Sequence, residues 1–223
     1  MTKITGPEVK AASGNVRQLV ILCHGYGADG NDLIGLAPYW QDLLPDADFI
    51  SPNAPQRCDV GFGYQWFPIS RLDPAELMRG VESAAPVLNT FIDEELAKRG
   101  LDDRHLALVG FSQGTMMSLH VGLRRQVSPV AILGYSGAMA GAERLQAEIK
   151  VKPPVFLIHG DADDVLPVSR MRDAAKALED AGVSVQCHVS RGVGHGIDPE
   201  GLGLGGQFLA HGFSAASGNV AAK

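Results

Sequence analysis

The sequence is short of cysteine, has no cluster of basic residues and contains no long apolar segment. Its three cysteines, Cys23, Cys58 and Cys187, are far apart and form no CxxC pair, which argues against a disulfide framework or a zinc knuckle. Three reduced thiols are typical of a cytosolic protein. The formal net charge of −6 makes nucleic acid or an anionic membrane surface a poor partner.

Targeting and membrane-spanning segments are also missing from the sequence pattern. Residues 1–16 mix charged residues with Gly6 and Pro7 and contain no apolar core of a signal peptide. No stretch approaches the ~20 apolar residues of a membrane span. We therefore expect a cytoplasmic protein without a membrane span.

Glycine is what the chain has in excess, with 27 in 223 residues. The glycines follow no G-X-Y period, which excludes collagen. Hydrophobic residues make up 45% and charged residues 20%, enough apolar material for a core, so a disordered chain is excluded. No linker or repeat interrupts the pattern, and we expect one domain over residues 1–213 with a flexible tail over 214–223.

Apolar runs and helical patterns alternate along the chain. Continuous apolar runs are typical of parallel strands covered on both faces. We predict strands at Leu19–Cys23, Phe49–Ser51, Leu106–Val109, Val130–Leu133, Val155–Ile158 and Val183–Val189. We predict helices at Asn31–Leu44, Pro74–Arg99, Gln113–Arg124 and Val168–Ala181. This alternation indicates an α/β fold with a mostly parallel sheet and right-handed crossovers.

The helix predicted over Pro74–Arg99 has the clearest start. Asp73 suits the N-cap, Pro74 the first helical position and Glu76 a capping box. Pro86 lies inside the pattern and is expected to kink or split the helix.

Residues 54–72 show neither helical nor strand pattern, which is long for a loop in a compact domain. Four of the 14 aromatic residues lie here: Phe62, Tyr64, Trp66 and Phe67. They predict either the wall of a pocket or a small hydrophobic cluster that holds the loop to the body.

Gly25–Gly30 matches GxGxxG after a predicted strand, the place of a dinucleotide-binding turn. Such a site needs an acid at the end of the second strand, whereas Asp48 lies at its start. We therefore favour a turn whose backbone N–H groups face a developing oxyanion. Dinucleotide-linked oxidoreduction remains a weaker alternative.

Gly110–Gly114 matches GxSxG with Ser112 at its centre. The match gains weight because a predicted strand precedes it and a predicted helix follows it. This is the arrangement of a nucleophile elbow, where small flanking residues let the serine adopt a strained backbone conformation. The alternative is a serine that merely caps a helix.

A nucleophilic serine needs a base, and the base needs an orienting acid. The segment 159–165 follows a predicted strand and carries Asp161, Asp163 and Asp164, while His195 lies between two glycines after the last strand. The carboxyl ends of parallel strands share one edge of a sheet, so these loops should meet there. The remaining histidines, His159 included, suit structural roles better, and Ser136 lacks the spacing of an elbow.

Taken together, these segments resemble the small carboxylesterase and acyl-protein thioesterase (phospholipase/carboxylesterase) branch of the α/β-hydrolases. The matching stretches are 24–30, 51–55, Trp66-Phe67, 110–114, 159–163 and Gly194-His195. The resemblance implies an α/β-hydrolase fold, with helices on both faces of the sheet and no large lid. It differs from the usual pattern in Pro86 and in the glycines of the last helix, Gly201, Gly203, Gly205 and Gly206.

The resemblance also implies the roles of individual residues. Ser112 would be the nucleophile, His195 the base and Asp163 its orienter, although spacing alone does not choose among the three acids. The backbone N–H groups of Tyr26 and Gln113 would form the oxyanion hole. The candidate substrate-binding residues are Trp66, Phe67 and Leu166. No metal or organic cofactor is expected, and a homodimer is possible within the family.

We thus expect a serine hydrolase that cleaves short- to medium-chain carboxylic esters. An acyl-(protein) thioesterase or a lysophospholipase with the same triad is the alternative, and a catalytically silent binding protein the remote one. The ~20 residues between the strands at Val130 and Val155 leave room for one short helix, which argues against a large mobile cap.

Overall fold

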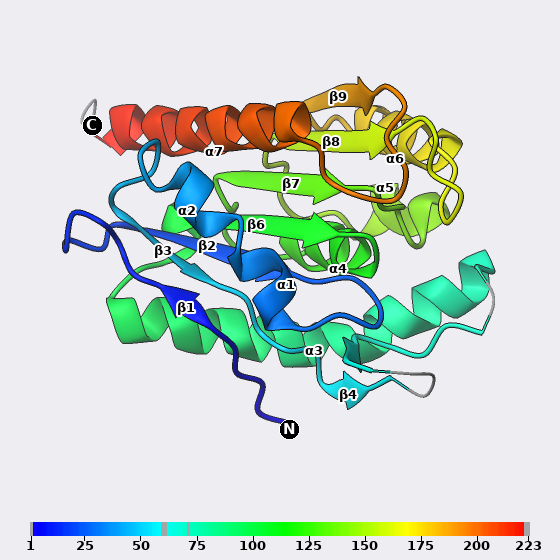
Figure 1. Cartoon of the computed structure of the whole chain (residues 1–223), viewed down its shortest axis with the longest axis horizontal. Helices are drawn as coiled ribbons and strands as arrows, with labels where there is room; N and C mark the ends of the chain where they lie inside the picture. Colours follow the sequence, from blue (N-terminus) through cyan, green and yellow to red (C-terminus); the bar gives the residue numbers. More distant parts are fainter. Residues whose placement is uncertain (1, 59–61, 71, 221–223) are drawn as a thin grey trace.

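A seven-stranded mixed sheet forms the centre of the computed structural model, which describes residues 2–58, 62–70 and 72–220 (Figure 1). The strand order is β1-β3-β2-β6-β7-β8-β9. All neighbouring pairs are parallel except β1 with β3. The strands are β1 (Glu8–Val9), β2 (Gln18–Cys23), β3 (Ala47–Ile50), β6 (Leu106–Phe111), β7 (Ala131–Tyr135), β8 (Val155–Gly160) and β9 (Val185–Ser190).

The six predicted strands are confirmed as β2, β3, β6, β7, β8 and β9. The sequence did not predict β1, a two-residue strand defined only by its pairing with β3. Nor did it predict the small antiparallel hairpin of β4 (Gln56–Arg57) and β5 (Tyr64–Gln65) within residues 54–72. Strands this short carry no periodicity that a sequence could show.

Helices cover both faces of the sheet, as predicted (Figure 1). One face carries α1 (Gly30–Ile34), α2 (Ala37–Trp40) and α7 (Pro199–Val220). The other carries α3 (Pro74–Arg99), α4 (Gln113–Gly122) and α6 (Ser169–Asp180). The segment between β7 and β8 adds only the short helices η2 (Ala142–Arg144) and α5 (Leu145–Glu148), and η1 (Asp103–His105) precedes β6. These short helices agree with the expectation that no large lid lies between β7 and β8.

Successive residues of the central strands pack on opposite faces. On β6, Leu106 and Leu108 join the core below α3 and α4, while Ala107 and Val109 join the core below α2 and α7. All four are fully buried. This burial on both faces explains why the strands appear in the sequence as continuous apolar runs.

The helix α3 has the predicted ends and runs as one element from Pro74 to Arg99. Asp73 accepts hydrogen bonds from the amides of Ala75 and Glu76, and Gly100 ends the helix with a φ of 65°. The helix continues through Pro86, so the expectation that it splits there is wrong. Pro86 lies on the exposed side, where its ring meets solvent rather than the core.

The single helix predicted over residues 31–44 is instead the pair α1 and α2. Asp29 caps α1 by accepting a hydrogen bond from the amide of Asn31. Pro38 lies in the first turn of α2, where a missing N–H costs nothing, and so it favours a new start over continuation.

The final helix α7 runs to Val220 and packs Gly205 against Tyr135 of β7 and Gly206 against Trp40 of α2. A Cβ on Gly205 would lie 2.0 Å from Tyr135 Oη, and one on Gly206 would lie 2.6 Å from the Trp40 ring. These glycines therefore allow close packing and do not shorten the helix. Residues 214–220 of the predicted tail are helical, and residues 221–223 lie outside the described residues.

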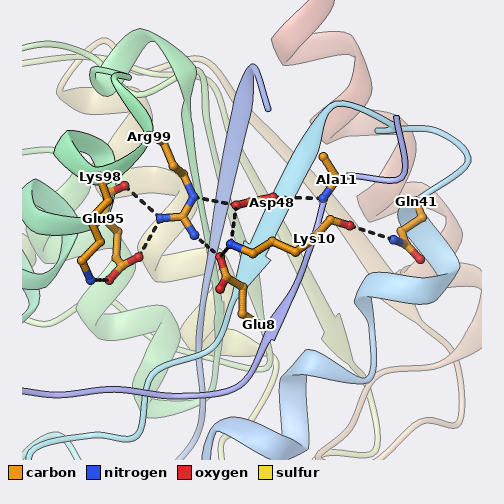
Figure 2. Close-up of polar contacts among 8 residues, drawn as sticks. All are labelled: Glu8, Lys10, Ala11, Gln41, Asp48, Glu95, Lys98 and Arg99. Atoms are coloured by element: carbon orange, nitrogen blue, oxygen red, sulfur yellow. Dashed lines mark hydrogen bonds and ion pairs between the residues drawn. The ribbon is translucent and has the colours of Figure 1, made fainter. Parts of the chain in front are cut away.

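An ion network joins the first strand, β3 and the end of α3 (Figure 2). Asp48 is almost fully buried and accepts hydrogen bonds from Arg99 Nε at 2.8 Å and from the Ala11 amide at 2.9 Å. Arg99 also pairs with Glu95 at 2.6 Å and with Glu8. Burial alone would raise the pKa of Asp48, but the hydrogen bonds from Ala11 and Arg99 outweigh it and lower the pKa.

Candidate active site

Ser112 lies on the predicted elbow between β6 and α4 with a strained backbone, φ 53° and ψ −115°. The flanking glycines are required by close contacts. A Cβ on Gly110 would lie 2.4 Å from the backbone of Gly114, and one on Gly114 would lie 1.8 Å from the Cys23 carbonyl oxygen. The tight strand–turn–helix expected from the motif is therefore present, and it places Ser112 at the N-terminus of α4.

His195 and Asp163 form a hydrogen bond across two loops. His195 Nδ1 lies 2.7 Å from Asp163 Oδ2, and the Asp163 side chain is fully buried while 18% of the His195 side chain is exposed. Asp163 Oδ1 accepts hydrogen bonds from the amides of Val165 and Leu166. Burial would raise the pKa of Asp163, but the hydrogen bonds from His195 and Leu166 outweigh it and lower the pKa.

The other two acids of this loop point elsewhere. Asp161 is exposed and accepts a hydrogen bond from the Gly192 amide at 2.6 Å. Asp164 is exposed as well. Of the three acids that spacing left open, Asp163 is the one that the structure pairs with His195.

The elbow lies between the loop of His195 and the turn at Gly25. The ring of Phe111, the residue before Ser112, lies 4.9 Å from the His195 ring, centroid to centroid. A Cβ on Gly25 would lie 3.3 Å from Ser112 Cβ. The carboxyl ends of β2, β6, β8 and β9 thus bring the turn, Ser112, Asp163 and His195 to one edge of the sheet, at the right of Figure 1.

The glycine-rich turn, residues 25–30, is hydrogen-bonded to the β4–β5 hairpin. The Gly27 amide donates to the Tyr64 carbonyl at 2.9 Å, and the Tyr64 amide donates to the Ala28 carbonyl at 2.7 Å. Gly27 has a φ of 81°, and a Cβ on Gly63 would lie 2.3 Å from the Gly27 carbonyl oxygen. These close backbone contacts between the turn and the hairpin explain the glycines at positions 27 and 63, and no bound dinucleotide is needed to explain them.

His24 holds the start of that turn. Its Nδ1 lies 2.7 Å from the Gly25 carbonyl oxygen, and its Nε2 accepts a hydrogen bond from the Ala54 amide at 3.0 Å. The two partners fix a neutral ring with the proton on Nδ1. Burial lowers the pKa of His24, which keeps the ring neutral at pH 7.

The Gln113 side chain connects the elbow to the long loop. Its side-chain oxygen accepts a hydrogen bond from the Trp66 amide at 2.9 Å, and its Nε2 donates to the Phe67 carbonyl at 2.8 Å. The Trp66 indole donates to the His24 carbonyl at 3.0 Å. The glycine-rich turn, the elbow and the long loop are therefore connected through buried hydrogen bonds.

The candidate substrate-binding residues all lie in the core. Trp66 and Phe67 are fully buried, and Leu166 is 2% exposed. A Cβ on Gly80 would lie 2.2 Å from the Phe67 ring, so the ring occupies a notch in α3. The burial fits the second interpretation of the loop, a cluster that holds it to the body, and substrate contact by these three residues stays a prediction.

Sequence reasoning missed several residues that support this edge. Ser136 has a φ of 44°, and its hydroxyl donates to the Gly196 carbonyl at 3.3 Å, beside His195. His159 contacts Asp163, and the Gln113 side chain spans to the long loop. A serine followed by glycine at the end of a buried strand, as at Ser136-Gly137, is the only sequence signal that could have pointed to the first of these.

The fold and this edge define the class of protein, an α/β-hydrolase with a nucleophile elbow. A family model described as phospholipase/carboxylesterase matches residues 4–211, and the chain belongs to that family. The expected resemblance and fold class are thereby confirmed.

Individual relatives agree with this assignment. The crystal structure of esterase PE8 is 45% identical, covers 94% of this chain and 99% of its own, and superposes with a TM-score of 0.90. Acyl-protein thioesterase 1 of Emericella nidulans is 30% identical over 81% of this chain and 84% of its own. Esterase YpfH of Escherichia coli is 25% identical over 85% of this chain and 81% of its own. The chain is accordingly a hydrolase of the carboxylesterase and thioesterase type.

The helices were also compared with what a lipid bilayer requires. Within residues 2–58, 62–70 and 72–220, no helix has both the length and the apolar character needed to cross a membrane.

Proposed function

We propose that the protein is a serine hydrolase that cleaves short- to medium-chain carboxylic esters with Ser112, His195 and Asp163 as its triad. The observation that carries the proposal is the His195–Asp163 hydrogen bond of 2.7 Å beside a serine in a strained elbow. Such a backbone is costly for a residue other than glycine, and the elbow motif requires it at the attacking serine.

The reaction has two steps. His195 accepts the Ser112 hydroxyl proton as Oγ attacks the ester carbonyl, and it then protonates the leaving alcohol, which leaves an acyl-serine. Water attacks the acyl-serine while His195 takes its proton, and the carboxylic acid is released as Ser112 is reprotonated. Asp163 holds the imidazole in the tautomer with the proton on Nδ1 and stabilises the imidazolium.

Charge on the tetrahedral oxygen needs donors at the same place. Gln113 is the first residue of α4, where a backbone N–H has no partner within the helix. Together with the Tyr26 N–H it would bind the oxyanion, and loss of one such donor typically costs ~3 kcal/mol of transition-state stabilisation.

A thioesterase or lysophospholipase is the second candidate, because the same triad cleaves acyl thioesters. Its support is the 30% identical relative named acyl-protein thioesterase 1. Against bulky lipid aggregates, the segment between β7 and β8 holds only η2 and α5 and offers no large cap.

The test is a series of p-nitrophenyl esters and acyl thioesters of increasing chain length. We expect turnover of the shorter members, and a fall in kcat/KM of at least ~10⁴-fold in Ser112→Ala and in His195→Ala. Asp163→Asn should lose ~10³–10⁴-fold, whereas Asp164→Asn serves as the matched control and should stay near wild type. Activity retained in Ser112→Ala would contradict the proposal, and a wild-type protein without turnover would favour a silent binding protein.

Setting and assembly also remain proposals. We propose a cytoplasmic protein that acts without a nucleic-acid partner, on the basis of its −6 charge and its three free cysteines. A homodimer is a further possibility that sedimentation would decide.

A further inference from the structure

His159 is a buried histidine beside the triad that the proposed chemistry leaves without a role. It lies near the end of β8, four residues before Asp163, and its side chain is completely buried. Its Nε2 lies 2.8 Å from the Leu166 carbonyl oxygen and 3.2 Å from Asp163 Oδ2. The same carboxylate oxygen is the one that His195 contacts.

The two neighbours of His159 Nε2 determine where the ring carries its proton. Both neighbours are hydrogen-bond acceptors, so Nε2 must be the donor. His159 Nδ1 is buried and has no hydrogen-bond partner among the described residues, so a second proton there would be an unpaired buried charge. The Nε2–H is therefore shared between a carbonyl and a carboxylate.

This shared hydrogen bond restrains the loop that carries Asp163. The Leu166 amide donates to Asp163 Oδ1 at 2.8 Å, and the Leu166 carbonyl accepts from His159. Leu166 is thus held at both its N–H and its C=O. The carboxylate is held at Oδ1 by two amides and at Oδ2 by two imidazoles, which leaves it little freedom to rotate.

We propose that His159 is a positioning residue for the acid of the triad, and that its Nε2–H directs Asp163 Oδ2 toward His195. The proposal rests on the triad proposed above. His159 has no access to substrate, because the space it borders is a cavity of about 10 Å³ that it shares with Thr115 and Met171, room for about one water molecule.

Removal of this donor should have two separate effects. The carboxylate becomes freer to turn, which lowers kcat. The Asp163 carboxylate also loses one hydrogen-bond donor, so its negative charge stabilises the His195 imidazolium more strongly. The acid limb of the pH profile of kcat/KM therefore moves to higher pH. The substitution leaves the other charged groups near this pair in place. These groups are Asp161 and Asp164 on the same loop and Arg191 and Asp198 on the His195 side.

The experiment compares His159→Leu with His159→Gln in the full chain. Glutamine keeps an N–H donor at similar reach, whereas leucine has the bulk but no donor. We expect kcat to fall by about 10- to 100-fold in His159→Leu, the range observed when an outer hydrogen-bond partner of a metal ligand is removed, with KM within about twofold. The acid limb should move to higher pH than in the wild type. His159→Gln should restore most of kcat and the wild-type acid limb.

Equal losses in both variants without a shift of the acid limb would show a merely structural residue and overturn the proposal. Wild-type kcat in His159→Leu would do the same. Should His159→Leu not fold, ¹⁵N chemical shifts of His159 in the wild-type protein decide the matter. We expect His159 to carry a proton on Nε2 in the folded protein, and protonation at Nδ1 alone would overturn the proposal.

The two proposals fail in different ways. A wild-type protein that hydrolyses no ester or thioester contradicts the triad, and the ¹⁵N shifts then still decide whether His159 donates. An active wild type whose His159→Leu variant is unchanged contradicts only the positioning role.

Discussion

Two serines at this sheet edge have a backbone that L-residues rarely adopt. Among non-glycine residues in the described parts of the chain, positive φ angles occur at Ser112 and Ser136. A residue in such a region costs on the order of 1–3 kcal/mol and persists only where the surrounding structure enforces it. At Ser112 the enforcement comes from β6 and α4, and its consequence is a side chain that projects from the turn.

The strain at Ser112 predicts an unusual order of stability. We expect Ser112→Gly to be more stable than Ser112→Ala by about 1 kcal/mol, because glycine adopts φ 53° without a Cβ clash. For a chain of this size the melting temperature should differ by about 2–4 °C, measured by calorimetry.

Ser118, inside α4, provides the matched control. Its helical backbone favours alanine, so Ser118→Gly should be the less stable of that pair by about 1 kcal/mol. The same order at both positions would show that Ser112 is not strained.

At the residue scale, the sequence indicated individual candidate residues more readily than the hydrogen-bond partners of those residues. Ser112 and His195 stood out because glycines flank them, a local signal. The choice of Asp163 over Asp161 and Asp164 depends on a hydrogen bond across 32 positions of sequence, which no spacing reveals. The Gln113 side chain likewise finds its partners at Trp66 and Phe67 only in the folded chain.

At the scale of elements, helix α7 shows how glycines can serve packing in place of flexibility. Gly205 faces Tyr135, whose hydroxyl donates to the Gly201 carbonyl at 3.1 Å. Gly203 is exposed, and a Cβ there would meet nothing within 4 Å. The two positions differ only in what lies opposite them.

This difference predicts opposite signs for the same substitution. Gly205→Ala should lower the free energy of unfolding by about 1–3 kcal/mol, because the Tyr135 ring is buried and cannot yield freely. Gly203→Ala should raise it by about 0.5–1 kcal/mol through helix propensity. Urea denaturation measures both, and equal effects at the two positions would contradict the packing account.

The elements that the sequence predicted well are those with a strong local pattern. The buried strands follow from apolar runs, and the start of α3 follows from Asp73 and Pro74. The short strands β1, β4 and β5 depend on partners elsewhere in the chain. Continuation of α3 past Pro86 reflects tertiary packing of the turns on either side, which outweighs the local preference.

At the scale of the molecule, the ion network of Figure 2 lies apart from the site. Asp48 is the second residue of β3, whereas the proposed triad residues follow the carboxyl ends of their strands. The network joins residues 8, 48, 95 and 99, so no local sequence pattern could predict it. Its position suggests a role in stability and none in turnover.

The network predicts a stability change that depends on pH. Asp48→Asn should lower the free energy of unfolding at pH 7 by about 2–3 kcal/mol, somewhat less than a fully broken buried pair, since Arg99 keeps Glu95. Because the folded pKa of Asp48 is lowered from 3.8, its contribution is complete above about pH 4 and is lost as pH falls through the folded pKa. The gap between wild type and variant should therefore shrink only below about pH 4.

Urea denaturation of the wild type and of Asp48→Asn across pH 3–7 measures this difference in the free energy of unfolding, with Asp180→Asn as control. Asp180 pairs with Lys176 on an exposed helix face and should change stability by less than about 0.5 kcal/mol. A constant gap for Asp48→Asn down to pH 3, or a fall in kcat/KM of the folded variant, would argue against this account.

The central claim is that Ser112 is an activated nucleophile, and labelling with a fluorophosphonate probe tests it most directly. We expect mass spectrometry to find one label per chain, on Ser112, in the wild-type protein and in Ser118→Ala. Ser112→Ala should take up none, and His195→Ala should label far more slowly. A wild-type protein that stays unlabelled, or a label located on another residue such as Ser136, would contradict the claim.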